Sequence, residues 1–288
     1  MGEIFILVRD AIRRSEPAAL ATVVEGDGLG AHLFVQPGRE PVGTLGNDDL
    51  DRVVTRDALG EIEAGRAGVR HYGTNGEANE TSVSVFIESY APPPQMLIFG
   101  AVDFTAALAR VAKVLGYRVT VCDARPVFAT KARFPMADDV VVDWPNRLLD
   151  LVGASLGPRD VVCVLTHDAK FDVPAIVSAL ATRAGYIGVM GSRRTHDDRT
   201  KRLREVGVDE TGFGRLHSPI GLDIGARTPE ETAISICAEI IALRTGRAAQ
   251  SLRVTAGPIH LACTLGPHLA PQLRAAARVG VGQASSRP

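Results

Sequence analysis

The chain has 288 residues, 45% of them hydrophobic and 23% charged, and its 32 Lys and Arg nearly balance its 33 Asp and Glu. This composition is that of a globular protein and excludes a disordered, collagen-like or coiled-coil chain. The net charge of −1 does not favour nucleic acid or an anionic membrane as a partner. The length predicts two domains.

The four cysteines do not form a recognisable site. Cys122, Cys163, Cys237 and Cys263 are far apart, and no two of them form a C-x-x-C pair. A disulfide scaffold and a zinc site are therefore not expected, and no metal ligands are assigned. No stretch reaches the roughly 18 consecutive apolar residues of a membrane span, so we expect a soluble, cytoplasmic protein with no membrane partner.

Residues 1–91 are predicted to form an α+β domain. The first segment has the spacing of an amphipathic helix with Ile4, Leu7, Val8 and Ile12 on one face. A second helix is expected over Asp48–Gly65, capped by Asn47 or Asp48. Alternating or β-branched runs among turn signals predict five strands: Leu20–Val24, His32–Gln36, Val42–Leu45, Gly68–Tyr72 and Ser82–Tyr90.

Three prolines, Pro92 to Pro94, mark a break, because they favour an extended spacer. Residues 95–247 then alternate short, continuously apolar strands with helices, which predicts a Rossmann-like parallel sheet. The strands are Met96–Phe99, Arg118–Cys122, Val140–Val142, Val161–Thr166 and Tyr186–Met190, and the helices are Phe104–Leu115, Arg147–Leu151, Val173–Arg183 and Arg193–Glu205.

A closing helix is predicted to begin at the capping box Thr228-Pro229-Glu230-Glu231 and to end at Gly246. Because it is mostly apolar, we expect it to be buried or to lie in an interface, and we expect the protein to form a homodimer. Residues 248–288 are rich in Gly, Ala and Pro, and we expect a loosely ordered tail.

The turn after the first of these strands is where a dinucleotide-binding fingerprint would lie. Gly100 is present, but Val102 replaces the second glycine, and Asp103 adds a negative charge at the helix N-terminus that repels phosphate. Asp123 lies where an acid would hold a ribose, with Arg125 close by. The alternative, which we favour, is that Asp123 caps the next turn. NAD(P) is therefore not expected to bind in the usual pose.

Polar residues follow two other strands of the sheet. Thr166-His167-Asp168 ends the fourth, where ligands of such sheets bind, although Asp172 also fits a helix cap and His167 a structural donor. Gly191-Ser192-Arg193-Arg194 ends the fifth and offers backbone amides, a hydroxyl and two guanidiniums to an anion such as phosphate. The alternative is an ordinary solvated helix start.

The loop Leu216–Thr228 is rich in Gly and Pro and almost uncharged. We expect it to fold tightly over the carboxyl edge of the sheet and to hold Asp223 as a semi-buried acid, which usually has a partner or a function. No catalytic residue is assigned, and the candidates are His167, Asp168 and Asp223.

Together these segments resemble the XdhC/CoxI family of xanthine dehydrogenase accessory factors. The resemblance rests on Leu165–Asp168, Gly188–Arg194, Ser218–Gly225 with Thr228–Glu231, and Asp123–Pro126 with Phe128-Ala129. It is strong over residues 96–246 and weaker over residues 20–88.

The resemblance implies an accessory protein, or chaperone, rather than an enzyme. Such a protein binds molybdenum cofactor (molybdopterin, a pterin phosphate) and passes it to a xanthine or carbon monoxide dehydrogenase apoenzyme, with a cysteine desulfurase as a further partner. The implied cofactor-binding residues are Gly100, Asp123, Arg125, Thr166, His167, Gly191, Ser192, Arg193, Arg194 and Asp223.

The chain departs from the family pattern in three places. The usual Gly-Ala-Gly-His turn is Gly100–Asp103 here, the Ser-Gly-Gly-Cys segment is Thr44–Asp49, and a later Cys-Gly-Gly is Asn79–Thr81. The family's two cysteines, suitable as soft metal ligands or sulfur carriers, are thus absent. Two alternatives stay open: an NAD(P)-dependent oxidoreductase, and a ligand-free homodimeric interaction module built on the closing helix.

Overall fold

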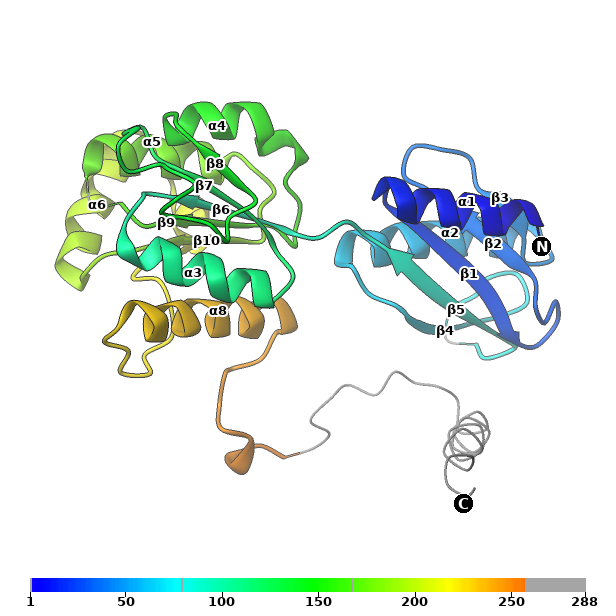
Figure 1. Cartoon of the computed structure of the whole chain (residues 1–288). Helices are drawn as coiled ribbons and strands as arrows, with labels where there is room; N and C mark the ends of the chain where they lie inside the picture. The colour runs from blue at the N-terminus through cyan, green and yellow to red at the C-terminus, as the bar shows by residue number, and fades with distance from the viewer. Residues whose placement is uncertain (1, 79, 167, 257–288) are drawn as a thin grey trace, which may run out of the picture. The chain divides into compact units, whose positions relative to one another are not determined.

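The computed structural model describes residues 2–256 except residues 79 and 167. His167 and most of the predicted tail therefore lie outside the described residues. The contacts divide the chain into two compact units, with one division between Pro92 and Pro93 and another between Ser251 and Leu252 (Figure 1). The first unit is an antiparallel sheet with two helices, and the second is a parallel sheet covered by helices on both faces. The predicted fold class, a Rossmann-like domain preceded by an α+β domain, is confirmed.

The first unit holds a five-stranded antiparallel sheet of order β3-β2-β1-β5-β4. Its elements are α1 (Gly2–Arg14), β1 (Ala18–Glu25), β2 (His32–Val35), β3 (Val42–Thr44), α2 (Asp48–Ala64), β4 (Gly68–Tyr72) and β5 (Val83–Tyr90). All five predicted strands and both predicted helices are present.

The two helices of this unit cover opposite faces of its sheet. Alternate strand residues such as Ala19 and Leu33 pack with α2, whereas Ala18 and Phe34 pack with α1. Asn47 is the cap of α2 and accepts a hydrogen bond from the Leu50 amide at 2.8 Å, which decides between the two predicted caps.

The second unit holds a six-stranded sheet of order β11-β10-β9-β6-β7-β8, with all strand pairs parallel. Its elements are β6 (Gln95–Phe99), α3 (Asp103–Val114), β7 (Arg118–Cys122), β8 (Asp139–Val141), α4 (Pro145–Val152), the 3₁₀ turn η1 (Gly153–Ser155), β9 (Val161–Val164), α5 (Ala169–Leu180), β10 (Tyr186–Val189), α6 (Arg193–Glu205), α7 (Glu210–Gly214), β11 (Leu216–His217) and α8 (Pro229–Thr245). A short 3₁₀ turn, η2 (Leu252–Val254), follows.

Both faces of this sheet are buried. Helices α3 and α8 cover one face, and α4, α5 and α6 cover the other (Figure 1). Successive residues of β6, Leu97 and Ile98, belong to the two different cores, which is why the strand is apolar throughout. The strand order reverses between β6 and β9, so a crevice for a ligand is expected outside their carboxyl ends.

Three features of the second unit differ from the sequence-based prediction. Helix α5 begins at Ala169, not at Val173, because Asp168 caps it and Pro174 is accommodated inside the helix. The two-residue strand β11 and the five-residue helix α7 are too short to give a periodic pattern.

The capping box of α8 is present as predicted: Thr228 caps the helix, and Gly246 ends it in the left-handed conformation. The helix packs against α3, but Ile234 and Ile241 on its outer side stay exposed. Within the described part of the chain, none of the helices has both the length and the apolar character to traverse a bilayer.

Candidate functional site

The carboxyl ends of β6 and β9 meet at the point where the strand order reverses. Gly100 follows β6 with φ +110°, a conformation that favours glycine. A Cβ atom at this position would lie 2.8 Å from Cγ2 of Thr166, which follows β9. The first glycine of the turn is therefore required for these two strand ends to approach.

Asp123, the predicted ribose-binding acid, is already engaged by its neighbours. Its Oδ2 accepts hydrogen bonds from the Ala101 amide at 2.7 Å and from Arg125 Nη2 at 2.8 Å, and its Oδ1 accepts from the amide and Nε of Arg125, both at 2.9 Å. Burial raises the pKa of this carboxyl, but the hydrogen bonds from Arg125 and Ala101 outweigh burial and leave the pKa lowered. A ribose would have to displace Arg125.

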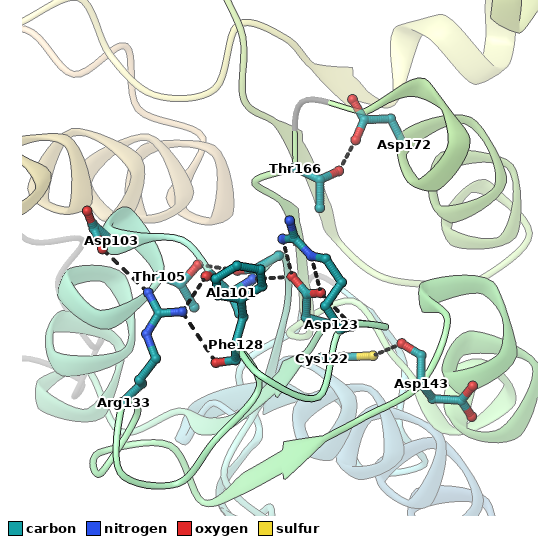
Figure 2. Close-up of polar contacts among 12 residues, drawn as sticks. Ala101, Asp103, Thr105, Cys122, Asp123, Phe128, Arg133, Asp143, Thr166 and Asp172 are labelled. Atoms are coloured by element: carbon teal, nitrogen blue, oxygen red, sulfur yellow. Dashed lines mark hydrogen bonds and ion pairs between the residues drawn. The ribbon is translucent and has the colours of Figure 1, made fainter.

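The turn above Asp123 is closed to a pyrophosphate. The Ala101 amide points at Asp123, and Val102 occupies the cap of α3 without a side-chain acceptor to offer. Asp103 carries its charge at the positive end of the α3 dipole, 3.5 Å from Arg133, which also donates to the Ala101 carbonyl at 3.1 Å. Figure 2 shows Asp123 and Arg133 both bonded to Ala101.

A second acid, Asp172, forms a buried network under the ends of β9 and β10. Thr166 donates its hydroxyl proton to Asp172, and Arg199 Nη2 donates to Asp172 at 2.9 Å and to the Met190 carbonyl at 2.9 Å. Arg199 Nη1 lies 3.4 Å from the Ser218 hydroxyl, in the loop after β11. The network thus fixes three loops at the carboxyl edge relative to one another (Figure 2 shows Thr166 and Asp172).

The sequence interpretation missed Arg199 and placed Asp172 incorrectly. Asp172 is not the cap of α5; the exposed Asp168 is, accepting from the Lys170 amide at 3.0 Å. One available signal for Arg199 was its spacing of four residues from Leu203, which places it on the buried face of α6. His167, the candidate between these residues, lies outside the described residues.

The turn after β10 presents groups suited to an anion. Gly191 has φ +155°, and the Ser192 hydroxyl caps α6 by accepting from the Thr195 amide at 3.2 Å. Arg193 and Arg194 are exposed at the first turn of the helix. Arg194 also lines a polar pocket of about 230 Å³ between α5 and α6, with Ala169, Asp172, Val173, Thr195, Asp198, Arg199 and Arg202.

Asp223 is exposed, so the expectation of a semi-buried acid was wrong. Other groups hold its loop: the Gly221 amide donates to Glu239 at 2.9 Å, and Ser235 donates to the Leu222 carbonyl at 2.6 Å. The loop is therefore tied to α8 through its backbone, which leaves Asp223 directed to solvent.

The three described cysteines are core residues. Burial raises the pKa of the Cys122 and Cys237 thiols to about 12 and raises that of Cys163 as well. Cys263 lies outside the described residues. In the segment where the family carries a cysteine, Asn47 caps α2 and also donates to the Thr74 carbonyl at 2.7 Å. Among residues 2–256 apart from 79 and 167, no group of three or more His, Cys, Asp or Glu is placed to hold a metal ion.

The fold and this edge define a doubly wound Rossmann-type protein whose first turn is closed and whose fifth-strand turn presents cations. The profile of the XdhC Rossmann domain matches residues 96–240, and that of the XdhC and CoxI family matches residues 11–73. The chain belongs to the XdhC and CoxI family.

Three curated relatives are similar to the chain. A Bacillus subtilis (strain 168) protein described as a probable xanthine dehydrogenase subunit is 35% identical over 165 residues, 57% of this chain and 47% of that protein. From Escherichia coli (strain K12), the uncharacterized protein YqeB is 27% identical over 239 residues (79% and 44%), and the molybdenum cofactor insertion chaperone PaoD is 24% identical over 159 residues (55% and 43%). The matches span less than half the length of these relatives.

The fold also resembles a solved structure from Bacillus halodurans that is described as a xanthine dehydrogenase. The TM-score is 0.51 at 24% identity, and the match covers 86% of this chain and 98% of that one. This likeness extends over both units and concerns the fold alone.

Proposed function

We propose that the protein is an accessory factor in the maturation of a molybdenum hydroxylase of the xanthine or carbon monoxide dehydrogenase type. It binds molybdenum cofactor, or a related phosphorylated ligand, and delivers it to the apoenzyme in the cytoplasm. Family membership and the similarity to a protein described as a molybdenum cofactor insertion chaperone support this role. The observation that carries the ligand assignment is the exposed Gly191–Arg194 turn at the carboxyl edge of the sheet.

The residues of this turn fit the phosphate of a pterin cofactor. The first turn of α6 offers backbone amides and the positive end of a helix dipole, and Arg193 and Arg194 add two guanidiniums. The buried Asp172–Arg199 pair holds the turn in place through the Met190 carbonyl. When it is bound, the cofactor supplies the molybdenum centre of the future enzyme, and the chain's own part is to hold its phosphate.

Asp168, at the neighbouring strand end, would face the polar edge of the ligand, because it is exposed just after β9 beside the point where the strand order reverses. Thr166 supports this edge from below, since its buried hydroxyl donates to Asp172, and a role for His167 stays a prediction. Asp223 is exposed on the adjacent loop and can approach a ligand only from the solvent side. Gly100, Asp123 and Arg125 shape the crevice and, in this arrangement, serve the fold rather than the ligand.

The first turn argues against a nicotinamide-dependent oxidoreductase. Its Ala101 amide and the Asp123 carboxylate satisfy each other, and Asp103 opposes a pyrophosphate at the start of α3. A dinucleotide in the usual pose would have to break the Asp123–Arg125 pair before it could bind.

The described thiols are buried and protonated at neutral pH, so they do not fit the role of a sulfur carrier. We therefore assign sulfuration of the cofactor to a partner such as a cysteine desulfurase, and delivery alone to this chain.

Calorimetric titration of the full chain with molybdenum cofactor tests the proposal. We expect the double variant Arg193→Ala/Arg194→Ala to weaken binding by at least about tenfold, because two charge-assisted contacts to phosphate are lost. The matched control is Arg52→Ala/Arg56→Ala on α2, where two exposed arginines are removed with the same change in charge. The control should bind like the wild type.

Two outcomes would overturn parts of the proposal. If the intact protein does not bind the cofactor, the delivery role is wrong. If it binds but both double variants behave like the wild type, the ligand lies elsewhere on the sheet. A parallel titration with NADH and NADPH separates the oxidoreductase alternative, which requires binding of one of them.

A further inference from the structure

The polar pocket between helices α5 and α6 lies beside the turn that we assign to phosphate (Figure 1 shows the two helices). Its volume of about 230 Å³ is large for a single oxyanion, because it has room for about seven water molecules. It is smaller than the roughly 300 Å³ at which pockets begin to hold a whole drug-sized ligand. The pocket therefore has the size to take one ring system at the end of a longer ligand.

The α6 wall of the pocket is a row of alternating charges. Arg194, Asp198 and Arg202 line the pocket and are four residues apart, so they lie on one face of the helix, one turn after another. The row extends over about 12 Å along the helix axis. Because Arg194 is also in the first turn of α6, the row begins at the turn that we assign to phosphate.

The charges of this row are available to a ligand. Among the described residues, no ion pair engages the guanidinium of Arg194 or that of Arg202. Asp198 lies 3.9 Å from Lys201, and both side chains are more than half exposed, so solvent screens this pair. A ligand would therefore not have to break a strong contact to reach the row.

The mixed charges of the pocket do not suit a simple ion. Asp172 and Asp198 would repel a bare phosphate or sulfate, and the three arginines of the lining would repel a metal cation. Arg199 already pairs with Asp172 at 2.9 Å, which leaves Asp198 between two cations as the pattern that a ligand meets. The matching ligand edge carries hydrogen-bond donors next to acceptors.

A 2-amino-4-oxo pyrimidine ring, which pterins and guanine share, has such an edge. Its ring N–H and its amino group point the same way and suit one carboxylate, with two parallel hydrogen bonds as in an arginine–carboxylate pair. Its carbonyl oxygen and the neighbouring ring nitrogen accept from an arginine, as guanine O6 and N7 do. Asp198 and Arg202, one turn apart, offer this acceptor and this donor side by side.

The α5 wall complements the charged row. Ala169 and Val173 line the pocket from the first turns of α5 and offer apolar contact to the face of a flat ring. Ala169 directly follows Asp168, the cap of α5, so a ring in the pocket also lies near the acid that we assign to the polar edge of the ligand.

We propose that the pocket between α5 and α6 holds the ring end of the ligand, a fused heterocycle with a 2-amino-4-oxo pyrimidine edge. Asp198 accepts hydrogen bonds from the ring N–H and the amino group, Arg202 donates to the carbonyl oxygen, and Arg194 reaches the phosphate. This inference rests on the proposed function, because the phosphate assigned to the turn after β10 brings the ligand to the pocket.

Calorimetric titration of the full chain with guanosine monophosphate and inosine monophosphate tests the edge, because the two differ only in the amino group. We expect guanosine monophosphate to bind at least about tenfold more tightly. Asp198→Asn should reduce this preference to within about twofold, because it removes the charged acceptor. The matched control is Asp197→Asn, which removes the same charge from an exposed residue of α6 that does not line the pocket, and it should keep the preference.

Two further arms assign the rest of the edge. Arg202→Ala should weaken both nucleotides to the same extent and leave the preference intact, because both ligands keep the carbonyl oxygen. Titration with neopterin monophosphate separates the two sources of the edge: tighter binding than guanosine monophosphate supports a pterin, and weaker binding supports a guanine nucleotide. Circular dichroism of each variant confirms that the chain is folded.

Equal affinity of the wild type for the two nucleotides, or a preference that survives Asp198→Asn, overturns the proposal. So does a wild-type chain that binds neither the nucleotides nor neopterin monophosphate. Titration with molybdenum cofactor keeps the two proposals apart. Cofactor binding that Asp198→Asn leaves unchanged overturns the pocket assignment alone, whereas a preference for guanosine monophosphate without any cofactor binding overturns the delivery role alone.

Discussion

Two turns at the carboxyl edge of the parallel sheet begin in the same way and end differently. Each starts with a glycine at positive φ, Gly100 after β6 and Gly191 after β10, and each leads directly into a helix. In the first, the following amide points down to Asp123, and an acid opens the helix. In the second, Ser192 caps the helix, and two arginines open it.

The difference teaches that the local charges, more than the place of the turn in the fold, set whether its groups are free to face an anion. The first turn lies where a phosphate usually binds in such a sheet, yet its Ala101 amide is already hydrogen-bonded to Asp123. The second lies two strands away in the sheet order and keeps its cations exposed. The ion pairs next to the two turns also differ. The Asp123–Arg125 pair closes the first turn, whereas the Asp172–Arg199 pair lies beneath the second turn and leaves it accessible.

The largest effect is expected from breaking the support of the second turn. Arg199→Met should lower the free energy of unfolding by about 3–5 kcal/mol, because it removes the guanidinium that pairs with the buried Asp172 carboxylate. Urea denaturation followed by fluorescence measures this in the second unit, since Trp144 is the single tryptophan of the chain. The double variant Asp172→Leu/Arg199→Met should recover most of the loss, and an unstable double variant would contradict this explanation.

Removing the acid that closes the first turn should have a smaller effect. Asp123→Asn replaces charge-assisted hydrogen bonds to Arg125 by neutral ones, so we expect a loss of about 1.5–3 kcal/mol at neutral pH. The same fluorescence-detected denaturation measures it. A variant as stable as the wild type would mean that the closed turn contributes nothing to the fold.

The pH dependence of that loss follows from the lowered pKa of Asp123. A carboxyl with a lowered folded-state pKa contributes stability that is fully present above its unfolded value of about 3.9 and is lost as the pH falls through the folded value. The difference between wild type and Asp123→Asn should therefore be constant near pH 7 and shrink below about pH 4. A difference that grows in acid would contradict the sign of the shift.

The two helix caps should respond in opposite directions. Ser192→Ala removes the side-chain acceptor of α6 and should cost about 1 kcal/mol. Val102→Thr adds an acceptor at the start of α3, where none exists, and should gain about 0.5 kcal/mol. Thermal denaturation of both variants checks this, and a loss in Val102→Thr would show that packing of Val102 against the core outweighs the cap.

The smallest effect is expected from opening the first turn. Val102→Gly/Asp103→Asn removes the Cβ obstruction and the negative charge, and should raise the affinity for inorganic phosphate about two- to fivefold. Phosphate NMR titration measures it. Glu230→Gln, which removes a negative charge from the first turn of α8, is the matched control and should leave the affinity unchanged. An equal gain in the control would mean that net charge, and not the turn, is responsible.

Much of the fold could be predicted because its signals are periodic. Strands buried on both faces are continuously apolar, as Met96–Phe99 is, and the cap of α8 lies in four consecutive residues. Helix α5 shows where a local signal misleads. Pro174 is typical of the first turn of a helix and drew the predicted start to Val173, whereas tertiary packing accommodates it one turn further in.

The site was less predictable, because its contacts join distant parts of the chain. Arg199 and Asp172 are 27 residues apart, and Arg199 stands in a helix whose other residues are nearly all polar. The prediction that Asp223 is semi-buried rested on its apolar sequence neighbours. The loop instead bonds its backbone to α8 and leaves the Asp223 side chain exposed to solvent. Whether the turn after β10 binds phosphate stays a prediction.

The close approach of Gly100 to Thr166 limits which residues the first position of the turn can accept. A side chain at position 100 would be strained at this positive φ and would collide with Thr166 at the neighbouring strand end, so folding by itself requires a glycine here. The positions of the second and third fingerprint glycines differ from it: Val102 makes no side-chain hydrogen bond at the start of α3, whereas Thr105 is buried and donates its hydroxyl to the Gly100 carbonyl. The fold therefore requires the first glycine of the motif whether or not a nucleotide binds, so a first glycine in such a turn is not evidence of nucleotide binding.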